Sequence, residues 1–457
     1  MKITQKEERK RLAEWKLACE LVKVIRHFFP DLLPLIKQLP DPRHQSYIRY
    51  PSSVLLMTRI LSSICYISSM RKTREEFNSE TIIQNIWDIC EEENTEGELP
   101  YWETINRYLE KLDPDALQEI VCQLCRRLLR SHAFDEMRIQ GKYWQILIDG
   151  TQLYSTQEEL DGRSLYRVHK KGTEGEYREN YYYVLEAKLV LSPEIVVSIF
   201  SEFVENPENG EFQKQDCEQK ACWRLMERLK RAFPRLPICL TADSLYACER
   251  WFRECQERDW RYLLRYKEGS IPQIAEEYQQ VRKIEGKREE IPLKDGISWY
   301  DTVNGIDYEG YRINLVEYGE KREVPYKKGK KKGTTREIQK QFWFLTDLPT
   351  KGKRKRELVG SGRRRWMIEN EGFNTQKRQG YHLEHLYSKD YQGFKNHYYL
   401  IQIGHMISQI LEAWKEIWKG VRQSREQKHR RLLESLKGIR IREEMGEEKK
   451  RFQIRFI

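Results

Sequence analysis

Two aspartates in this 457-residue chain follow short apolar runs and could support metal-dependent chemistry. Asp149 comes directly after the run 146–148 (Ile-Leu-Ile), and Asp243 follows the run 239–242 (Cys-Leu-Thr-Ala). A sheet holds a carboxylate rigidly at the end of a strand while the group faces solvent, and Mg²⁺ prefers such oxygen ligands. An aspartate followed by Gly or Ser also begins turns, so each of these residues alone could be a turn residue.

A third carboxylate lies in the stretch 363–373, which reads Arg-Arg-Arg-Trp-Met-Ile-Glu-Asn-Glu-Gly-Phe. At about 100° per residue, Arg365 and Glu369 share one face of a helix, one turn apart, with Lys377 about 80° further round. That face presents a carboxylate flanked by cations, although a solvated ladder of ion pairs would follow the same pattern. Glu371 lies about 200° round the helix from Glu369, so the two cannot enter one pocket.

The hydrophobic pattern predicts the elements that must position these residues. Residues 1–140 have helical periodicity, and from Tyr143 the pattern changes to strands. The segments predicted next are strands at 144–148, 182–191 and 195–204, a helix at 212–233, a strand at 238–241, a helix at 246–258 and a strand at 262–266. Residues 281–345 are again strand-like, whereas 363–379 and 394–437 are predicted to be helical. The aspartates then follow the first and fourth strands of a β-β-β-α-β-α-β unit, and the glutamate lies on a later helix.

This layout, together with three short motifs, resembles the DDE transposases of bacterial insertion sequences, whose catalytic domain has the RNase H-like fold. The motifs are Ile148-Asp149-Gly-Thr151, Ala242-Asp243-Ser-Leu-Tyr246 and Arg365-Trp-Met-Ile-Glu369-Asn, the last of which is similar to the Tyr-Arg-Glu-Lys signature of the family. The resemblance covers roughly residues 140–400, and more loosely 41–43 and 99–105. The long gap between Asp243 and Glu369 fits the β insertion that a related subgroup carries there.

Two positions depart from the family signature. Gly362 stands where the signature has Tyr, and Lys377 follows Glu369 by eight residues instead of seven. Glu369 is preferred to Glu371 because it keeps the spacing to Arg365 and precedes an asparagine, as in the family.

The resemblance implies an α/β fold, with an RNase H-like mixed sheet flanked by helices, a β-rich insertion, a helical N-terminal region and a basic helical C-terminus. The expected boundaries are a helical DNA-binding region at 1–140, a catalytic domain at 141–280 and 342–400, the insertion at 281–341 and the C-terminal region at 401–457.

The resemblance also implies a mechanism. Asp149, Asp243 and Glu369 would hold two Mg²⁺ ions, with Mn²⁺ as a substitute, about 3.5–4 Å apart. One ion would activate water or a DNA 3′-hydroxyl, and the other would stabilise the leaving oxygen. Arg365 would clamp a phosphate through two parallel hydrogen bonds, and Lys377 would contact phosphate as a point charge.

The expected function is therefore that of a transposase that binds the terminal inverted repeats of its element, cleaves double-stranded DNA and transfers the ends to target DNA. A cut-and-paste route and a homodimer on DNA are expected. A related metal-dependent nuclease without strand transfer and a non-catalytic DNA-binding descendant are the alternatives.

The charge distribution agrees with a polyanionic partner. The net charge is +11 and the pI is about 9.0. Residues 326–365 contain 15 Lys or Arg against 3 Asp or Glu, and residues 415–457 contain 14 against 7. Loop lysines that we expect to contact DNA phosphates are Lys327, Lys328, Lys330, Lys331 and Lys332, although such a run can also serve solubility alone.

Trp299, in the expected insertion, is a candidate for stacking on an unpaired base near the cleaved end, as an insertion aromatic does in related transposases. Packing in a core is the alternative for this side chain.

The charged N-terminus and the interrupted apolar stretch predict a cytoplasmic protein without membrane contact, and the resemblance implies a bacterial protein associated with the nucleoid. Charged residues crowd positions 1–10, and the longest apolar stretch, 54–70, is interrupted by Arg59 and serines. Cys122 and Cys125 form a Cys-x-x-Cys pair without the second pair that a zinc ribbon requires, so we expect buried, reduced thiols.

Overall fold

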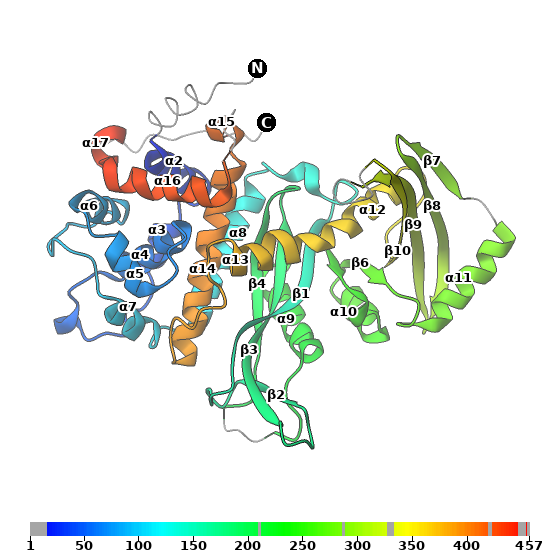
Figure 1. The fold of residues 1–457 in the computed structure, drawn as a ribbon, viewed down its shortest axis with the longest axis horizontal. Helices are drawn as coiled ribbons and strands as arrows, with labels where there is room; N and C mark the ends of the chain where they lie inside the picture. Colours follow the sequence, from blue (N-terminus) through cyan, green and yellow to red (C-terminus); the bar gives the residue numbers. More distant parts are fainter. Residues whose placement is uncertain are drawn as a thin grey trace.

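The computed structural model describes residues 16–208, 212–285, 288–326, 333–418, 423–446 and 454. Figure 1 shows a group of helices, a central sheet and a second group of long strands side by side. The loop lysines predicted to contact DNA (Lys327, Lys328, Lys330, Lys331 and Lys332) lie outside the described residues. None of the helices in the described ranges is both long and apolar enough to cross a membrane.

A mixed sheet forms the centre of the fold (Figure 1). Its strands are β1 (Trp144–Thr156), β2 (Leu165–His169), β3 (Tyr177–Val190), β4 (Val196–Val204), β5 (Ile238–Ala242), β6 (Arg261–Tyr266), β7 (Glu289–Leu293), β8 (Gly296–Tyr308), β9 (Tyr311–Pro325) and β10 (Thr335–Thr346). They follow the order β2-β3-β1-β5-β6-β10-β9-β8-β7, and β4 pairs with β3. Strands β1, β5 and β6 are parallel, whereas β3 is antiparallel to both β1 and β4. The path β4-β3-β1-β5-β6 is the predicted RNase H-like core.

Helices cover both faces of this core. Strands β4 and β5 are buried along their whole length, which explains why apolar residues in their sequences do not follow a strict alternation with polar ones. On one face Tyr398 of α14 (Tyr391–Ala413) donates a hydrogen bond to Ser201. The residue before Ser201 in β4, Phe200, points to the other face, where Arg228 of α9 (Glu218–Ala232) lies over its ring. The remaining core helix, α10 (Glu249–Glu257), connects β5 to β6.

The predicted first strand is too short, and one strand was missed. Strand β1 does not end before Asp149 but continues to Thr156, because β3 pairs with it antiparallel as far as Asn180. Asp149 therefore lies within a strand, opposite Glu186. Strand β2 was not predicted, because it is short and only partly buried and pairs with the outer end of β3.

The predicted insertion is continuous with the core sheet. Strand β10 pairs antiparallel with β6 and carries β9, β8 and β7 beyond it. The expected boundary after residue 280 falls inside α11 (Pro272–Glu285), and the boundary after residue 341 falls inside β10. The described strands of this region therefore extend the core sheet.

The two terminal helical regions pack together as one unit. The N-terminal helices are α2 (Leu17–Phe28), α3 (Leu32–Lys37), α4 (Ser52–Ile64), α5 (Met70–Glu76), α6 (Glu80–Ile89), α7 (Trp102–Leu109) and α8 (Pro114–Arg130). The C-terminal helices are α15 (Lys415–Trp418), α16 (Arg425–Gly438) and α17 (Ile441–Met445). Helix α14 packs on α4 and α8, and α16 packs on α2 and α6. The boundary expected after residue 400 falls within α14, a buried helix, so the chain does not divide there.

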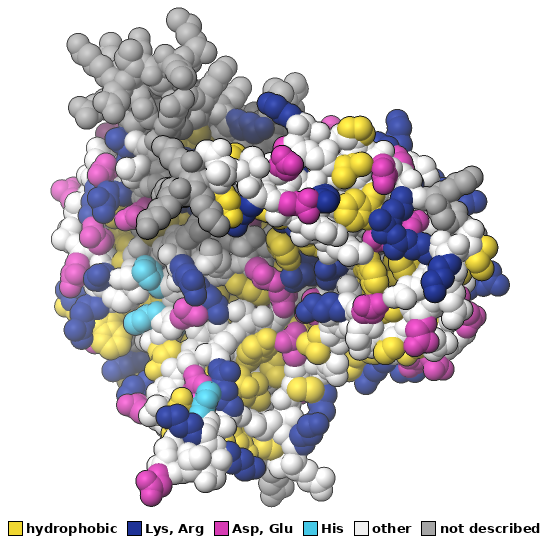
Figure 2. Space-filling model, turned by 45° about the vertical axis from the view of Figure 1, so that its right-hand side comes forward, with side chains coloured by type: hydrophobic (Ala, Val, Ile, Leu, Met, Phe, Trp, Pro, Cys, Tyr) yellow, Lys and Arg dark blue, Asp and Glu magenta, His cyan; other side chains and the backbone are white. Residues whose placement is uncertain are grey.

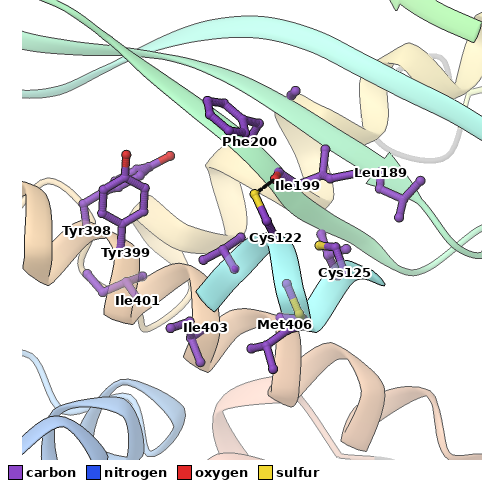
Figure 3. Close-up of a cluster of buried hydrophobic side chains, with 14 of the residues drawn as sticks. Cys122, Cys125, Leu189, Ile199, Phe200, Tyr398, Tyr399, Ile401, Ile403 and Met406 are labelled. Atoms are coloured by element: carbon purple, nitrogen blue, oxygen red, sulfur yellow. Dashed lines mark hydrogen bonds between the residues drawn. The ribbon is translucent and has the colours of Figure 1, made fainter. Parts of the chain in front are cut away.

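The Cys-x-x-Cys pair lies in this shared core, where Figure 3 shows α8 packed between β4 and α14. The thiol of Cys122 donates to the carbonyl oxygen of Ile199 at 3.5 Å, and that of Cys125 donates to Ser198 at 3.3 Å. Both thiols are buried and free, so the prediction of buried thiols is confirmed for this pair.

A run of short helical segments follows the sheet and carries the expected signature. It consists of α12 (Arg354–Arg363), a 3₁₀ turn (Arg364–Trp366), a π-helix (Ile368–Asn374) and α13 (Thr375–Arg378). Other 3₁₀ turns in the described chain are η1 (Gln45–Tyr47), η2 (Asp135–Met137) and η3 (Ser244–Tyr246).

Candidate active site

The two aspartates occupy matching positions on neighbouring parallel strands. Strands β1 and β5 pair in register up to Leu147 and Thr241. Two residues beyond this pair, the chains reach Asp149 and Asp243. Because parallel strands lie about 4.8 Å apart, this register brings the two residues to one edge of the β1–β5 ladder. Asp243 also begins a turn, since its Oδ1 accepts a hydrogen bond from the Leu245 backbone N–H at 2.8 Å.

Arg365 connects Glu369 to Asp149. The guanidinium donates from Nη2 to Glu369 Oε1 at 2.7 Å and from Nη1 to Asp149 Oδ2 at 3.3 Å. The arginine side chain is only 11% exposed, whereas that of Glu369 is 49% exposed. The helical run is thus tied to β1 by one cation that bridges two of the expected catalytic carboxylates.

The π-helix explains the unusual spacing of Lys377. A π turn contains one residue more than an α turn, so it rotates everything after it back by about 100°. Because of that extra residue, Lys377, eight positions after Glu369, points where the seventh position would point in a regular α-helix. That direction is about 20° from the direction of Glu369. Lys377 reaches β1, the strand that Arg365 also contacts, since its Nζ donates to the carbonyl oxygen of Gln152 at 2.5 Å. The Lys377 ammonium also pairs with Glu384.

Glu371 points to a different part of the fold. It pairs with Arg425 of α16, with Nη2 to Oε2 at 2.6 Å. The same guanidinium pairs with Glu412 of α14. Glu371 therefore joins the π-helix to the C-terminal helices.

Burial and negative neighbours act together on Asp149. Desolvation, together with the charges of Glu218 and Glu369, raises the pKa of this carboxyl to about 7, against the opposing effect of Arg365. A cation that approaches this carboxyl therefore stabilises its ionised form.

Sequence reasoning missed Glu218, a fourth carboxylate beside Asp149. It is the first residue of α9, and both of its oxygens accept hydrogen bonds, from the hydroxyls of Tyr183 and Tyr246. Nothing in the local sequence around Glu218 marks it, because its two partners come from distant segments of the chain.

A groove of about 260 Å³ lies next to Arg365. Its wall includes the aromatic side chains of Phe342 and Trp366 and the cations Arg265 and Arg363. Trp366 is 52% exposed. Burial, followed by repulsion from Arg365, lowers the pKa of Arg265. The groove therefore combines positive charge with open aromatic surface. Figure 2 shows one face of the molecule, on which basic and acidic side chains are interspersed.

The presence of Gly362, which stands where the family signature has tyrosine, has a steric cause. This glycine is buried, and a Cβ atom there would lie 2.6 Å from Cδ1 of Phe344. The Phe344 ring fills the space in which a tyrosine side chain would begin, so no larger residue fits at this position.

Trp299 does not lie open to a base. Its side chain is buried on β8, its indole N–H donates to Glu317 at 3.2 Å, and Arg288 stacks on its ring. The ring covers Gly319 on the neighbouring strand β9. In this structure the indole packs as a core side chain, which was the alternative to base stacking.

The donor set suits a hard divalent cation, but the donors have not converged. Asp149, Asp243 and Glu369 would offer only carboxylate oxygens, which are the ligands that Mg²⁺ prefers. Among the described residues, no three acidic, His or Cys side chains come close enough to hold a metal ion. Arg365 neutralises two of the carboxylates instead.

Comparison with known proteins adds a family assignment. The family model described as Transposase DDE domain matches residues 213–407, a range that contains Asp243 and Glu369 but begins after Asp149. The model described as DDE_Tnp_1-associated matches residues 33–125. No curated protein sequence matches the chain significantly.

Among solved structures, the chain is similar to a cryo-EM structure of the piggyBac transposase synaptic complex with hairpin DNA. The two are 11% identical, with a TM-score of 0.41 over 94% of this chain and 82% of that chain. The two family models together span well over half of the chain, and because both the DDE domain and its associated domain are matched, the chain belongs to the DDE transposases.

Proposed function

We propose that this transposase cleaves the terminal inverted repeats of its element and joins them to target DNA with Asp149, Asp243 and Glu369 as its catalytic carboxylates. The observation that carries the proposal is that β1, β5 and the helical run are linked near one edge of the sheet. Strands β1 and β5 deliver the aspartates in register, and the helical run brings Glu369 to β1 through Arg365.

The metal that best suits these residues is Mg²⁺, with Mn²⁺ as a substitute, because all three donors are carboxylates. Bound divalent ions supply activation of the attacking oxygen and stabilisation of the leaving oxygen. The chain's own residues position the DNA. Arg365 exchanges its carboxylate partners for a phosphate of the bound end, and its planar fork then holds that phosphate at two points.

The groove beside Arg365 is the proposed binding site for the DNA end. Its cations, Arg265 and Arg363, face the same space as the exposed indole of Trp366. The two arginines can bind phosphates, and a base can stack on the indole. Lys377, which now donates to the β1 backbone, is the proposed second phosphate contact.

The wider reaction follows from this site. We infer a cut-and-paste route, with a homodimer that holds two ends and with the N-terminal helices contacting the repeat. The protein would act in the bacterial cytoplasm, on the nucleoid.

The test is an end-mapping experiment. Purified protein is incubated with the DNA that flanks its own gene, a target plasmid and Mg²⁺, and the products are sequenced. Cleavage at the repeats with joining to the plasmid supports the proposal. Cleavage without joining identifies a nuclease, and binding without cleavage identifies a non-catalytic descendant.

A further inference from the structure

The carboxylate of Glu218 joins β3, which pairs with the strand that carries Asp149, to the turn that Asp243 begins. Its Oε2 accepts a hydrogen bond from the Tyr183 hydroxyl at 2.6 Å, and its Oε1 accepts one from the Tyr246 hydroxyl at 2.5 Å. Tyr183 lies on β3 and pairs with Gln152 of β1, three residues after Asp149. Tyr246 ends the turn that Asp243 begins. One side chain thus joins the strand beside Asp149 to the turn that carries Asp243.

Gly150 lets this bridge approach the backbone of β1. A Cβ atom on Gly150 would lie 2.7 Å from Glu218 Oε2 and would also collide with the Tyr183 hydroxyl. The Asp-Gly pair at 149–150 is therefore not a turn, because β1 continues through it. The glycine leaves room for a carboxylate immediately next to Asp149.

The bridge spans a gap in the backbone ladder. The pairing of β1 with β5 ends at Leu147 and Thr241, so no backbone hydrogen bond of that ladder fixes Asp243 relative to Asp149. The Tyr246 ring is buried and packs against Trp251, which leaves its hydroxyl aimed at Glu218. The two tyrosine hydrogen bonds are then the side-chain connection between the turn and the sheet at this point.

We propose that Glu218 is a positioning residue that holds Asp243 at the correct distance from Asp149 for the two to share a divalent cation. The inference rests on the proposed catalytic role of these aspartates. It assigns Glu218 no contact with the metal, because both of its oxygens are occupied by tyrosine hydroxyls.

The test compares variants that break the bridge with one that retains it. Tyr246→Phe removes one hydrogen bond and keeps the buried ring, and Glu218→Ala removes both. Glu218→Gln retains the bridge, because an amide offers an acceptor and a donor and a hydroxyl can take either role. The matched control is Tyr50→Phe, which removes a similar tyrosine–glutamate hydrogen bond (Tyr50 to Glu98, 3.1 Å) in the N-terminal helices.

We measure DNA cleavage against Mn²⁺ concentration. Tyr246→Phe and Glu218→Ala should raise the half-saturating Mn²⁺ concentration about tenfold, as expected for a hydrogen bond to a charged group, with a much smaller change in rate at saturating metal. Tyr246→Phe should add little in a Glu218→Ala background, because the bridge is already broken there. Glu218→Gln and Tyr50→Phe should behave like wild type. If Glu218→Gln is as damaging as Glu218→Ala while Tyr246→Phe is harmless, Glu218 is a metal ligand and the proposal is wrong.

Hydrogen exchange of the backbone amides at 245–247 provides a readout that does not depend on activity. The exchange should be faster in Glu218→Ala and Tyr246→Phe than in wild type and Tyr50→Phe. Unchanged exchange would overturn the positioning role even if cleavage falls. Failure of the wild-type protein to cleave under any metal condition would instead refute the proposed function, and the exchange experiment would still decide whether Glu218 fixes the turn.

Discussion

Replacing Arg365 by Met should tighten metal binding in the free protein while abolishing DNA cleavage. In the structure the Arg365 guanidinium neutralises Asp149 and Glu369, which is the role a divalent cation would take. A metal ion must therefore displace it. Methionine keeps much of the aliphatic stem and removes the charge, so the carboxylates of the variant are left without this competitor.

The size of the effect follows from the two contacts. The pair with Asp149 is mostly buried and contributes about 1.5 kcal/mol, whereas the pair with the half-exposed Glu369 contributes about 0.5 kcal/mol. Displacement of Arg365 then costs about 2 kcal/mol, which corresponds to about 30-fold in affinity. We expect Arg365→Met to bind Mn²⁺ about 30-fold more tightly than wild type when DNA is absent.

The assay is a Mn²⁺ titration followed by electron paramagnetic resonance, in parallel with a cleavage assay. The matched control is Arg364→Met, since the Arg364 guanidinium donates to Ser361 Oγ and lies about 120° from Arg365 in the 3₁₀ turn. An Asp149→Asn, Arg365→Met double variant should lose the gain in affinity. Equal or weaker Mn²⁺ binding in Arg365→Met would refute the cation site, and retained cleavage would refute the phosphate contact.

Three other results are expected. Glu371→Gln should lower the free energy of unfolding by about 1 kcal/mol through loss of the pair with α16, and it should keep cleavage. Glu369→Gln should keep the free energy of unfolding and lose cleavage. Denaturant melts and cleavage assays measure the two effects. Neutralising the lysines at 327–332 should weaken binding to DNA of any sequence and flatten the salt dependence of affinity. An unchanged salt dependence would indicate that these lysines serve solubility instead. Burial lowers the pKa values of His397 and His405 well below the usual range, so the folded protein keeps them neutral while the unfolded chain takes up protons below about pH 6.5. Between pH 7.5 and 5.5 these two histidines should therefore lower stability by about 3 kcal/mol, an effect that proton uptake by Asp149 in the folded protein partly offsets, and a rise in stability over this range would contradict the prediction.

Local sequence patterns predicted the parts of the site that depend on strands and on helix phase. The apolar runs before Asp149 and Asp243 are strands, and their register follows from parallel pairing. Arg365 and Glu369 are one turn apart and in contact, as their spacing predicts. These features are local, so periodicity can reveal them.

Features that depend on distant contacts could not be predicted. The continuation of β1 through Gly150 requires pairing with β3 and the space used by Glu218. The π-helix that corrects the direction of Lys377 has no signature in composition. The burial of Trp299 follows from its contacts with β9, and the amphipathic pattern of the C-terminal helices does not reveal that α14 is enclosed by the N-terminal ones.

The central claim is that Asp149, Asp243 and Glu369 act together on DNA, and the most direct measurement is cleavage by the three single amide variants. Asp149→Asn, Asp243→Asn and Glu369→Gln should each lower the cleavage rate at least about 10³-fold, since a divalent-ion site contributes several kcal/mol. DNA affinity and thermal melting should stay close to wild type, and Glu371→Gln serves as the matched acidic control. Cleavage at the wild-type rate by any one of the three variants would contradict the account.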